Sequence, residues 1–598
     1  MREYSVPAIG TVADEESLTD MVWANAERFA DAVAFRRRVD GSWIDVTTAE
    51  FAAQVAAVAK GLIGSGLRAG DRVALLSRTR YEWTLLDFAI WAAGCVTVPV
   101  YETSSAEQIA WILGDSGARA VVVETEAHRH TVEKVVDRLA EVEHVWQIEP
   151  GGELDPAVDE LTAAGADVSD KTAHERRLAV RSADTATLVY TSGTTGRPKG
   201  VELTHRNLLA EIRADIAAFP QLMRPSNAML VFLPLAHVFA RAIALCCVYS
   251  RTTLGHLPDV RDLVADLATF RPSFIVAVPR VFEKVYNSAK QRAHAAGRGR
   301  VFDLAEELAV EYSTALDGPG PSLALKARRA AMSKLVYSRL RGVLGGRCVA
   351  AISGSAPLGE HLAHFFRGVG VPVYEGYGLT ETSAAICVNT ERAFRVGTVG
   401  KPVAGASVRI ADDGEILLSG EMVFRGYWHN PAATAEVLED GWLRTGDLGT
   451  LDDEGFLRIT GRKKDIIVTA GGKNVAPALL EDRVRRHPLV SQCVVVGDRQ
   501  PFVAALVTLD PDFVSVWAAS HGKQLTVADL VDDPDLRAEI RTAVDEANRA
   551  VSKAESIREF TILPRDFTEA AGEITPSMKV RREAIIKAYA EEIAALYG

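Results

Sequence analysis

Short apolar runs of strand length alternate with longer stretches of helical periodicity through about the first 460 residues of the chain. Continuous runs of Val, Ile, Leu and Ala that end at turn residues are typical of strands buried on both faces. Because helix-length segments separate these runs, the pattern predicts an α/β fold in which mostly parallel sheets are flanked by helices. The predicted strands are residues 71–77, 118–124, 186–191, 273–279, 349–355 and 371–378.

The pattern changes from Gly405 onward, where short strands and turns replace the alternation. The pair Asp413-Gly414 is a hairpin signal, and the texture predicts a small β-barrel-like subdomain at about 405–460. Strands and helices return after the segment Arg462–Asp465, and a chain of 598 residues is too long for one hydrophobic core. We therefore expect two domains, a large one over 1–462 and a smaller α+β domain over 463–598.

Composition narrows the class of protein. Hydrophobic residues make up 48% of the chain and the formal net charge is -12, which is typical of a globular protein and argues against nucleic-acid binding. The six cysteines form no Cys-x-x-Cys pair, which predicts free thiols. The N-terminal segment lacks the apolar core of a signal peptide, and no run reaches the ~18 apolar residues of a membrane span. The sequence therefore predicts a cytoplasmic protein and leaves homodimerisation open.

One segment departs from the acidic average. Between Gly318 and Gly359 there is no Asp or Glu, and apolar residues recur at roughly helical spacing, which predicts a basic amphipathic helix over 323–347. A helix docked by its apolar stripe, with the basic face in solvent, is the favoured interpretation. The alternative is peripheral contact with anionic lipid at the inner face of the membrane or with a phosphorylated substrate. The basic residues are Lys326, Arg328, Arg329, Lys334, Arg339, Arg341 and Arg347.

The loop TSGTTGRPKG at 191–200 follows an apolar strand and combines glycines, hydroxyls and a lysine. Such a loop can direct backbone N–H groups and hydroxyls toward a phosphate. It is not a Walker A loop, because Gly196 is followed by Arg197 rather than by Lys and Ser or Thr, and Pro198 prevents a helix from running through it. From composition alone, a purely structural turn remains an alternative.

The longer string YTSGTTGRPKG resembles the AMP-binding signature of the acyl-adenylate-forming enzymes, the superfamily of acyl-CoA synthetases, luciferases and nonribosomal peptide adenylation domains. The resemblance covers nearly the whole chain. It implies a reaction in which a carboxylate joins the α-phosphate of ATP, pyrophosphate leaves, and the acyl group then passes to a thiol. The further motifs, in the expected order, are LPLAHVFAR (233–241), GSAPL (354–358), YEGYGLTET (374–382), GEMVFRGYW (420–428), DGWLRTGDLG (440–449), ITGRKKDIIV (459–468) and GEITPSMKVRR (572–582).

The resemblance implies roles for individual residues around ATP. Thr380 would bond the α-phosphate, and Glu381 with Thr194 would hold Mg²⁺, for which hard oxygen ligands are suited. Asp447 would accept both ribose hydroxyls, and Arg462 would reach the same ribose. The residues around the β- and γ-phosphates would be Thr191, Ser192, Gly193, Thr194, Thr195, Gly196 and Lys199. Those around the adenine would be Gly354, Ser355, Ala356, Glu375, Gly376, Tyr377 and Gly378.

The same resemblance implies that Lys579 bridges the acyl carboxylate and the α-phosphate during adenylation. The smaller domain would then turn about a hinge at Lys464, Lys579 would leave, and the loop of Gly471, Gly472 and Lys473 would line the channel for coenzyme A. For His237, a role beside the acyl pocket and a satisfied interior histidine are equally supported.

The sequence says less about which carboxylic acid is activated and which thiol accepts the acyl group. The stretch 440–465 resembles the fatty-acyl-CoA synthetase signature, and no acidic residue suited to pairing with an amino-acid amine is apparent. The sequence thus predicts ligation of a medium- or long-chain fatty acid to CoA. The alternatives are a fatty-acyl-AMP ligase that serves an acyl carrier protein and a catalytically silent scaffold. Candidates for the acyl tunnel wall are Val238, Phe239, Arg241, Val278 and Pro279.

Overall fold

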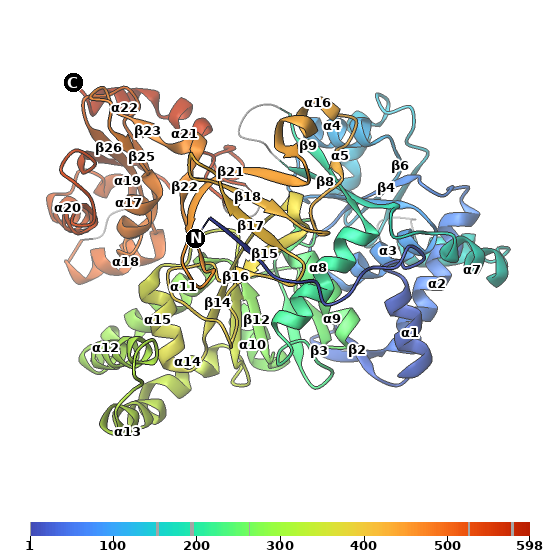
Figure 1. The fold of residues 1–598 in the computed structure, drawn as a ribbon, viewed down its shortest axis with the longest axis horizontal. Helices are drawn as coiled ribbons and strands as arrows, with labels where there is room; N and C mark the ends of the chain where they lie inside the picture. The colour runs from blue at the N-terminus through green and yellow to red at the C-terminus, as the bar shows by residue number, and fades with distance from the viewer. Residues whose placement is uncertain (1, 151–154, 192–196, 262, 524–526, 576–578) are drawn as a thin grey trace.

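The six predicted strands are present, each within two residues of its expected bounds, and they lie in two large sheets. The computed structural model describes residues 2–150, 155–191, 197–261, 263–523, 527–575 and 579–598. In the described chain, a large N-terminal domain of mixed sheets is followed by a separate C-terminal domain (Figure 1). The predicted α/β fold class is therefore confirmed.

The first sheet has seven strands among the described residues, in the order β19-β9-β8-β5-β4-β6-β7. Its centre is parallel and its edge antiparallel, because β8 turns directly back into β9 through the glycine-rich loop. A strand follows this loop where a Walker A loop would begin a helix. The strands are β4 (Arg72–Leu76), β5 (Val96–Val100), β6 (Ala118–Val123), β7 (His144–Gln147), β8 (Thr185–Thr191), β9 (Lys199–Thr204) and β19 (Gly426–Tyr427).

The second sheet has the order β16-β15-β14-β13-β12-β10-β11-β2-β3. The strands from β14 to β2 are parallel, so the loops after β13 and β14 leave the sheet at its carboxyl edge, where α/β folds commonly bind ligands. The strands are β2 (Val33–Val39), β3 (Ser42–Thr47), β10 (Ala228–Val231), β11 (Thr253–His256), β12 (Phe274–Ala277), β13 (Ala350–Ser353), β14 (Val373–Leu379), β15 (Ala384–Val388) and β16 (Lys401–Pro402).

The β-rich segment predicted at about 405–460 forms a third, antiparallel sheet, in which Asp413-Gly414 makes the turn between β17 and β18. The N-terminal strand β1 pairs with β17, a contact that local patterning could not reveal. The strands are β1 (Glu3–Ser5), β17 (Ser407–Ile410), β18 (Glu415–Ser419), β20 (Leu438–Glu439), β21 (Trp442–Leu451) and β22 (Leu457–Arg462).

The chain leaves this sheet at Arg462, the last residue of β22, through a 3₁₀ turn over Lys463–Asp465. The C-terminal domain that follows has its own apolar core between a three-stranded sheet and its helices. The predicted boundary between 462 and 463 stays a prediction. The strands of this part are β23 (Ile467–Val468), β24 (Asn474–Val475), β25 (Val490–Val496), β26 (Val503–Leu509) and β27 (Ile557–Ile562).

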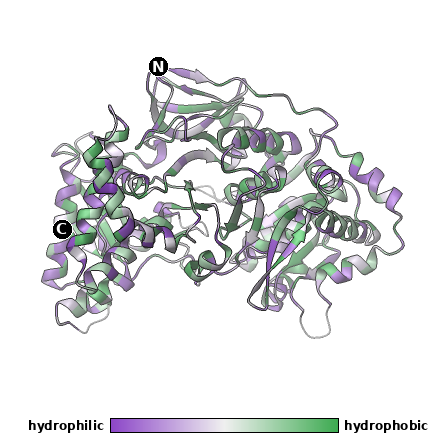
Figure 2. Cartoon of the chain, turned by 90° about the horizontal axis from the view of Figure 1, so that it is seen from below, coloured by the Kyte–Doolittle hydropathy of each residue, from purple (hydrophilic) through white to green (hydrophobic). Residues whose placement is uncertain are grey.

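Helices pack against both large sheets, with hydrophobic faces toward the strands and hydrophilic faces outward (Figure 2). In the N-terminal domain they are α1 (Asp20–Arg28), α2 (Thr48–Gly64), α3 (Tyr81–Ala92), α4 (Ala106–Ser116), α5 (Glu126–Val136), α6 (Ala157–Ala164), α7 (Asp170–Leu178), α8 (His205–Ala218), α9 (Val238–Ser250), α10 (Leu263–Phe270), α11 (Pro279–Ala295), α12 (Gly299–Leu316), α13 (Leu323–Met332), α14 (Ser338–Val343), α15 (Glu360–Val369) and α16 (Pro431–Val437). In the C-terminal domain they are α17 (Pro477–Val484), α18 (Pro511–Ser520), α19 (Val527–Leu530), α20 (Pro534–Asn548), α21 (Arg582–Ala588) and α22 (Ala590–Ala595).

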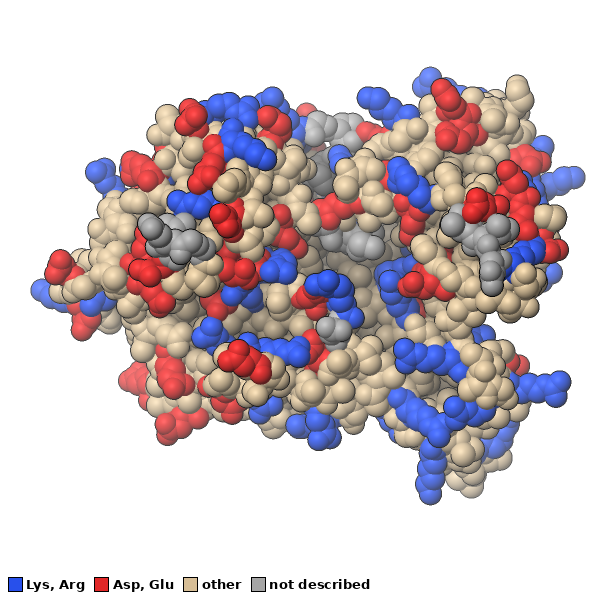
Figure 3. Space-filling view, turned by 180° about the vertical axis from the view of Figure 1, so that it is seen from behind, with Lys and Arg blue, Asp and Glu red and all other residues tan. Residues whose placement is uncertain are grey.

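The prediction of one basic helix over 323–347 is wrong in its extent. A π-helical turn over Ser333–Tyr337 separates α13 from α14, and the helix ends at Val343. Gly345 follows with a positive φ of 85°, a conformation that favours glycine and ends the helix. The expected apolar stripe is docked, since Leu325 and Leu340 are buried. Five of the seven basic residues are exposed, and Figure 3 shows Lys and Arg side chains over this lobe. The half-buried Arg329 and Arg341 instead donate to the carbonyls of Gly368 and Val369 at the end of α15.

The cysteines and the lengths of the helices bear on the kind of protein that the sequence predicts. All six cysteines are buried and free, as predicted. A search of the described residues finds no helix with the length and apolarity that crossing a bilayer requires.

Candidate active site

The Asp447 carboxylate, near the end of the large domain, is hydrogen-bonded to two other predicted site residues, Arg462 and Tyr377. Asp447 on β21 lies opposite Arg462 on β22, and its carboxylate accepts from Arg462 Nε at 2.7 Å. The second carboxylate oxygen accepts from the Tyr377 hydroxyl, also at 2.7 Å. Burial raises the pKa of Tyr377 well above its ordinary value, and the Asp447 charge adds to this effect. Tyr377 therefore remains a hydrogen-bond donor, and the buried Asp447 carboxylate is held by one neutral and one charged donor.

Local backbone geometry explains the glycine next to this tyrosine. The hairpin between β14 and β15 changes register between Tyr377 and Gly378. A Cβ atom at Gly378 would lie 1.6 Å from the carbonyl oxygen of Ala384, so any larger residue would displace the hairpin. The register shift falls directly after Tyr377. The next turn, a 3₁₀ helix over Thr380–Thr382, carries Thr380 and Glu381, the predicted phosphate and metal residues.

Glu381 in that turn is linked to the other large sheet. Its carboxylate accepts from the Tyr427 hydroxyl on β19 at 2.8 Å. The amine of Lys199, the first residue of β9, lies 4.9 Å from the centre of the Tyr427 ring, within the range of a cation–π contact. A predicted phosphate ligand and the predicted metal ligand therefore face one tyrosine.

The loop between β8 and β9 is described only at its ends. Thr191 pairs with Lys199 at the base of the hairpin, and the Trp111 indole N–H donates to the Pro198 carbonyl at 2.8 Å. The predicted residues Ser192, Gly193, Thr194, Thr195 and Gly196 lie outside the described residues, so their assignments remain predictions.

Lys579 reaches this group from the C-terminal domain. Its backbone N–H donates to the Thr575 hydroxyl at 3.0 Å, and Ile574 pairs with Val580, so the lysine extends from a short hairpin. Surrounding protein atoms lower the pKa of the Lys579 amine, and the charge of Arg462 lowers it further, whereas the Asp447 and Glu381 carboxylates oppose this. The Lys579 residue is nevertheless exposed to solvent.

Comparison with known proteins bears on this constellation. The AMP-binding enzyme family model matches residues 22–428, and the model of the AMP-binding enzyme C-terminal domain matches residues 464–598. The chain belongs to the AMP-binding enzyme family. The superfamily resemblance deduced from the sequence motifs is thereby confirmed.

Full-length relatives of this AMP-binding enzyme share substantial identity. The chain is 53% identical to "Long-chain-fatty-acid–CoA ligase FadD15" of Mycobacterium tuberculosis over 600 residues, with 100% of both proteins covered. It is 31% identical to "Long chain acyl-CoA synthetase 7, peroxisomal" of Arabidopsis thaliana, covering 99% of this chain and 87% of the relative. The fold is similar to that of an anthranilate CoA ligase in complex with anthranoyl-AMP, with a TM-score of 0.74, 20% identity, and 98% and 99% of the two chains covered.

The enzyme's His237 is the residue before α9, where its Nδ1 accepts from the Phe239 N–H at 3.2 Å. Burial lowers the pKa of His237 to about 3, and the nearby Lys579 charge contributes. The imidazole is therefore neutral at physiological pH. The His237 side chain accepts a hydrogen bond at the N-terminus of α9, as an interior structural histidine would. It also lies near Lys579, as a residue beside the reaction site would. A catalytic role for His237 stays a prediction.

The loop over Gly354, Ser355 and Ala356 leaves the carboxyl end of β13. A Cβ atom at Gly354 would lie 3.3 Å from the Phe239 ring, so this glycine lets the loop pass close to α9. The buried Glu375 carboxyl accepts from the Leu358 N–H at 2.8 Å and fixes the end of the same loop. Burial raises the pKa of Glu375 to about 8. Its predicted contact with the adenine stays a prediction.

We expect Glu375→Gln to change how stability depends on pH. An unfolded Glu loses its proton near pH 4.5, whereas the folded Glu375 keeps it up to about pH 8. The folded state therefore loses stability as pH rises through this window, by at most about 1.4 kcal/mol per pH unit. The melting temperature of Glu375→Gln should rise relative to that of the native enzyme as pH rises. The melting temperature of Glu391→Gln, a change at an exposed residue, should keep a constant difference from the native value. Parallel pH profiles for all three proteins would contradict the assignment.

The predicted CoA-channel residues are not part of the cluster. Gly471, Gly472 and Lys473 are exposed, and the Lys473 amine lies 3.3 Å from the Glu555 carboxylate within the C-terminal domain. Lys464 is exposed in the turn after β22. In this arrangement Lys579 lies among residues predicted to bind the nucleotide, and the predicted channel loop does not. This is the arrangement expected for the adenylation step. Roles in the second step stay predictions.

The prediction that Arg241 lines an acyl tunnel is wrong. Its guanidinium makes two hydrogen bonds with Asp87 on α3, at 2.6 and 2.9 Å, and a third with the Thr187 hydroxyl at 2.8 Å. Both charged side chains are buried. Arg241 therefore ties α9 to the first sheet. The sequence alone could not show that Arg241 is buried in an ion pair, because its partner Asp87 is 154 positions away.

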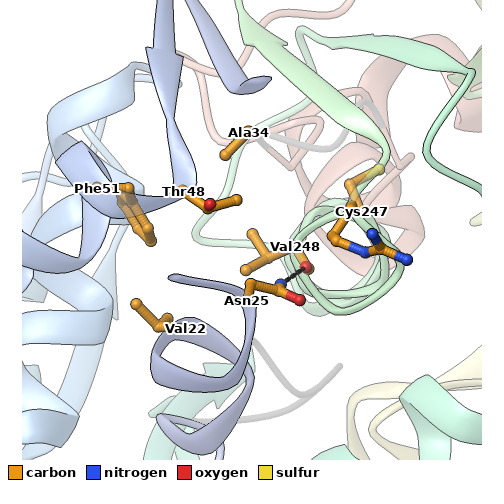
Figure 4. A pocket seen from close by; sticks show the side chains of 8 residues that line it. Val22, Asn25, Ala34, Thr48, Phe51, Cys247 and Val248 are labelled. Carbon is orange, nitrogen blue, oxygen red and sulfur yellow. Dashed lines mark hydrogen bonds between the residues drawn. The ribbon is translucent and has the colours of Figure 1, made fainter. Parts of the chain in front are cut away.

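Sequence reasoning also missed Tyr427, although the motif GEMVFRGYW was identified. Its bond to Glu381 depends on the pairing of β19 with β9, which no local pattern announces. A separate recess between α1, α2 and α9 is lined by apolar side chains with Asn25, Thr48 and Arg251 (Figure 4), and none of the predicted site residues lines it.

Proposed function

We propose that this enzyme converts a long-chain fatty acid, ATP and coenzyme A into acyl-CoA, AMP and pyrophosphate. A carboxylate oxygen attacks the α-phosphorus of ATP and pyrophosphate leaves. The thiol sulfur of CoA then attacks the acyl carbonyl carbon, its proton is lost, and AMP leaves with the electron pair of the broken bond. The observation that carries the proposal is the identity of 53% over the full length of FadD15, together with the meeting of Lys579, Asp447, Arg462 and Glu381 from two domains.

The cluster suits the chemistry of the first step. A fatty carboxylate and a triphosphate repel each other, so catalysis requires positive charge positioned where they meet. The Lys579 amine and the Arg462 guanidinium supply it. Asp447 offers a fixed carboxylate for the ribose hydroxyls, and Tyr377 offers an aromatic face for the adenine. No protein nucleophile is needed, since the acyl carboxylate itself attacks.

The described residues fit a magnesium ion held mainly by the nucleotide. Among them, no group of three or more His, Cys, Asp and Glu side chains is arranged around a common metal position. Mg²⁺ commonly takes only one or two protein carboxylates and keeps water and phosphate oxygens for the rest. Glu381 would supply that carboxylate, oriented by Tyr427. When bound, the ion would neutralise the phosphate charge.

The proposal is tested with pyrophosphate release over saturated acids of increasing chain length, with and without CoA. We expect turnover to rise toward long chains and to require CoA for more than one equivalent of pyrophosphate. The second candidate, a fatty-acyl-AMP ligase, would release adenylate only to a carrier protein and would show no stimulation by CoA. A fatty-acid-independent pyrophosphate signal would contradict both.

We further propose that the lobe formed by α12, α13 and α14 contacts an anionic membrane surface from which the fatty acid arrives. Leu323 is 84% exposed and Leu335 is 57% exposed. Apolar side chains interleaved with cations fit a lipid interface. Figure 3 shows Lys and Arg gathered over this lobe. We call this the basic face, defined by the exposed residues Lys326, Arg328, Lys334, Arg339 and Arg347.

Charge reversal tests the basic face. We expect the triple change of Lys326, Lys334 and Arg339 to Glu to weaken binding to phosphatidylglycerol-containing vesicles at least tenfold, since each basic residue near such a surface contributes about 1 kcal/mol. Reversal of Arg549, Lys553 and Lys587 on the C-terminal domain gives a matched change of net charge. Equal loss of sedimentation with vesicles in both variants would contradict a localised face.

A further inference from the structure

An ion pair joins helix α11 of the large domain to the C-terminal domain. Arg280 is the second residue of α11 in the large domain, and its Nη2 donates to the Asp510 carboxylate of the C-terminal domain at 2.6 Å. The same nitrogen donates to the Ser491 hydroxyl at 3.2 Å. Both Arg280 and Asp510 are largely buried, with 17% and 4% of their side chains exposed. In Figure 1, α11 lies beside α18, whose start Asp510 caps.

The C-terminal domain presents acidic groups at this contact. The Ser491 hydroxyl donates to Asp566, which also accepts from the Thr508 hydroxyl at 2.6 Å. The Asp566 carboxylate is therefore linked through Ser491 to the same Arg280 guanidinium that binds Asp510. Within the described part of the chain, Arg280 is the cation within 4.0 Å of the Asp510 carboxylate. A buried carboxylate that loses its cation is strongly destabilised, so this contact favours the domain orientation in which it forms.

Neighbouring charges face the same interface. Glu283, one turn along α11, lies 3.3 Å from Arg280. Across from it, α17 carries Asp482, and Arg485 follows α17. Burial alone would lower the pKa of Arg485, yet the Asp482 and Glu283 carboxylates raise it above its ordinary value. Burial raises the pKa of Asp482, whose charge Arg485 favours and Glu283 opposes. The two domains therefore meet with alternating charges at the start of α11.

The position of this contact relates it to catalysis. It joins the large domain to the C-terminal domain, which also carries Lys579. It is present in the same arrangement in which the charges of Arg462, Asp447 and Glu381 act on the Lys579 amine. We expect a turn of the domain that removes Lys579 to separate Arg280 from Asp510 as well. Forming the contact and delivering the amine are thus two consequences of one orientation.

We propose that Arg280 is a positioning residue that holds the C-terminal domain, through Asp510 and Ser491, in the orientation that delivers Lys579 to the nucleotide. Its guanidinium is bound to the C-terminal domain. Its effect is on the population of the adenylation orientation, so it favours the first half-reaction over the second. This inference rests on the proposed two-step function.

The test compares Arg280→Ala and Arg280→Lys with Arg292→Ala, which removes an exposed arginine farther along α11. We expect Arg280→Ala to slow pyrophosphate release in the absence of CoA about tenfold, the factor that corresponds to about 1.4 kcal/mol of orientation preference. Transfer from preformed acyl-adenylate to CoA should be unchanged or faster. Arg280→Lys should retain part of the adenylation rate, and Arg292→Ala all of it. Equal slowing of both half-reactions would overturn the proposal.

A second measurement does not depend on ligase activity. Spin labels on cysteines introduced at Arg392 and Lys553, one in each domain, report the interdomain distance, and the native cysteines are buried. We expect Arg280→Ala to broaden the distance distribution and Arg280→Asp combined with Asp510→Arg to narrow it again. An unchanged distribution in Arg280→Ala would overturn the role of the contact, whatever reaction the enzyme catalyses. Absence of ligase activity in the native enzyme, with the distribution broadened as expected, would reject the proposed function alone.

Discussion

Lys579→Ala is expected to slow acyl-adenylate formation by at least two to three orders of magnitude. The amine supplies positive charge between two anions, and fixed donors at such positions contribute about 3–4 kcal/mol to the transition state. The charges of Arg462, Asp447 and Glu381 all act on the Lys579 amine. Pyrophosphate release in the absence of CoA measures this step.

The second half-reaction provides the contrast. Supplied with synthetic acyl-adenylate and CoA, Lys579→Ala should form acyl-CoA at the native rate, because the amine is predicted to have left the site by then. Lys587→Ala, which removes an exposed lysine of the same domain, should leave both steps intact. Equal loss in both half-reactions would refute the proposed domain rotation.

Asp447→Asn is expected to lower kcat/KM for ATP by about a hundredfold. The substitution removes the charge that pairs with Arg462 at 2.7 Å and one acceptor for the ribose hydroxyls. Asp447 is buried, whereas 49% of the Arg462 side chain is exposed, so we expect a cost near the low end of the ~2–5 kcal/mol that is common for a fully buried pair. A hundredfold change corresponds to about 2.7 kcal/mol. Adenylation rates at varied ATP concentration give the value.

Nucleotide analogues make this test specific. The native enzyme should discriminate against 2′,3′-dideoxy-ATP, and Asp447→Asn should lose most of that discrimination. Tyr377→Phe removes only the hydroxyl that donates to Asp447 at 2.7 Å, so its loss should be nearer tenfold. Undiminished discrimination in Asp447→Asn would show that the carboxylate acts on the protein alone.

Sequence patterning predicted the strands because parallel strands covered on both faces must be apolar throughout, and turn residues bound them. It predicted the short strands of the segment at about 405–460 for a related reason, since Asp413-Gly414 determines a turn locally. The motifs named the candidate site residues, and the structure brings Tyr377, Asp447, Arg462, Glu381 and Lys579 together although they come from separate segments.

The remaining features depend on contacts between distant segments. The Arg241–Asp87 pair spans 154 positions, and the Arg280–Asp510 pair spans 230. From sequence, an arginine in an apolar helix could line a tunnel, lie at the surface or form a buried ion pair. Which of these occurs depends on the residues of the element that packs against the helix. The β1 strand likewise pairs with a sheet some 400 residues later. Periodicity carries no information about such partners.

The fate of the carboxylate oxygens tests the central claim most directly. With a long-chain fatty acid labelled with oxygen-18 in its carboxyl group, single turnover with ATP and CoA should yield AMP that carries one labelled oxygen, because the acyl carboxylate forms the bond to the α-phosphorus that CoA later breaks at the carbonyl carbon. Unlabelled AMP, or label appearing in inorganic phosphate alongside ADP, would contradict an acyl-adenylate intermediate in this enzyme.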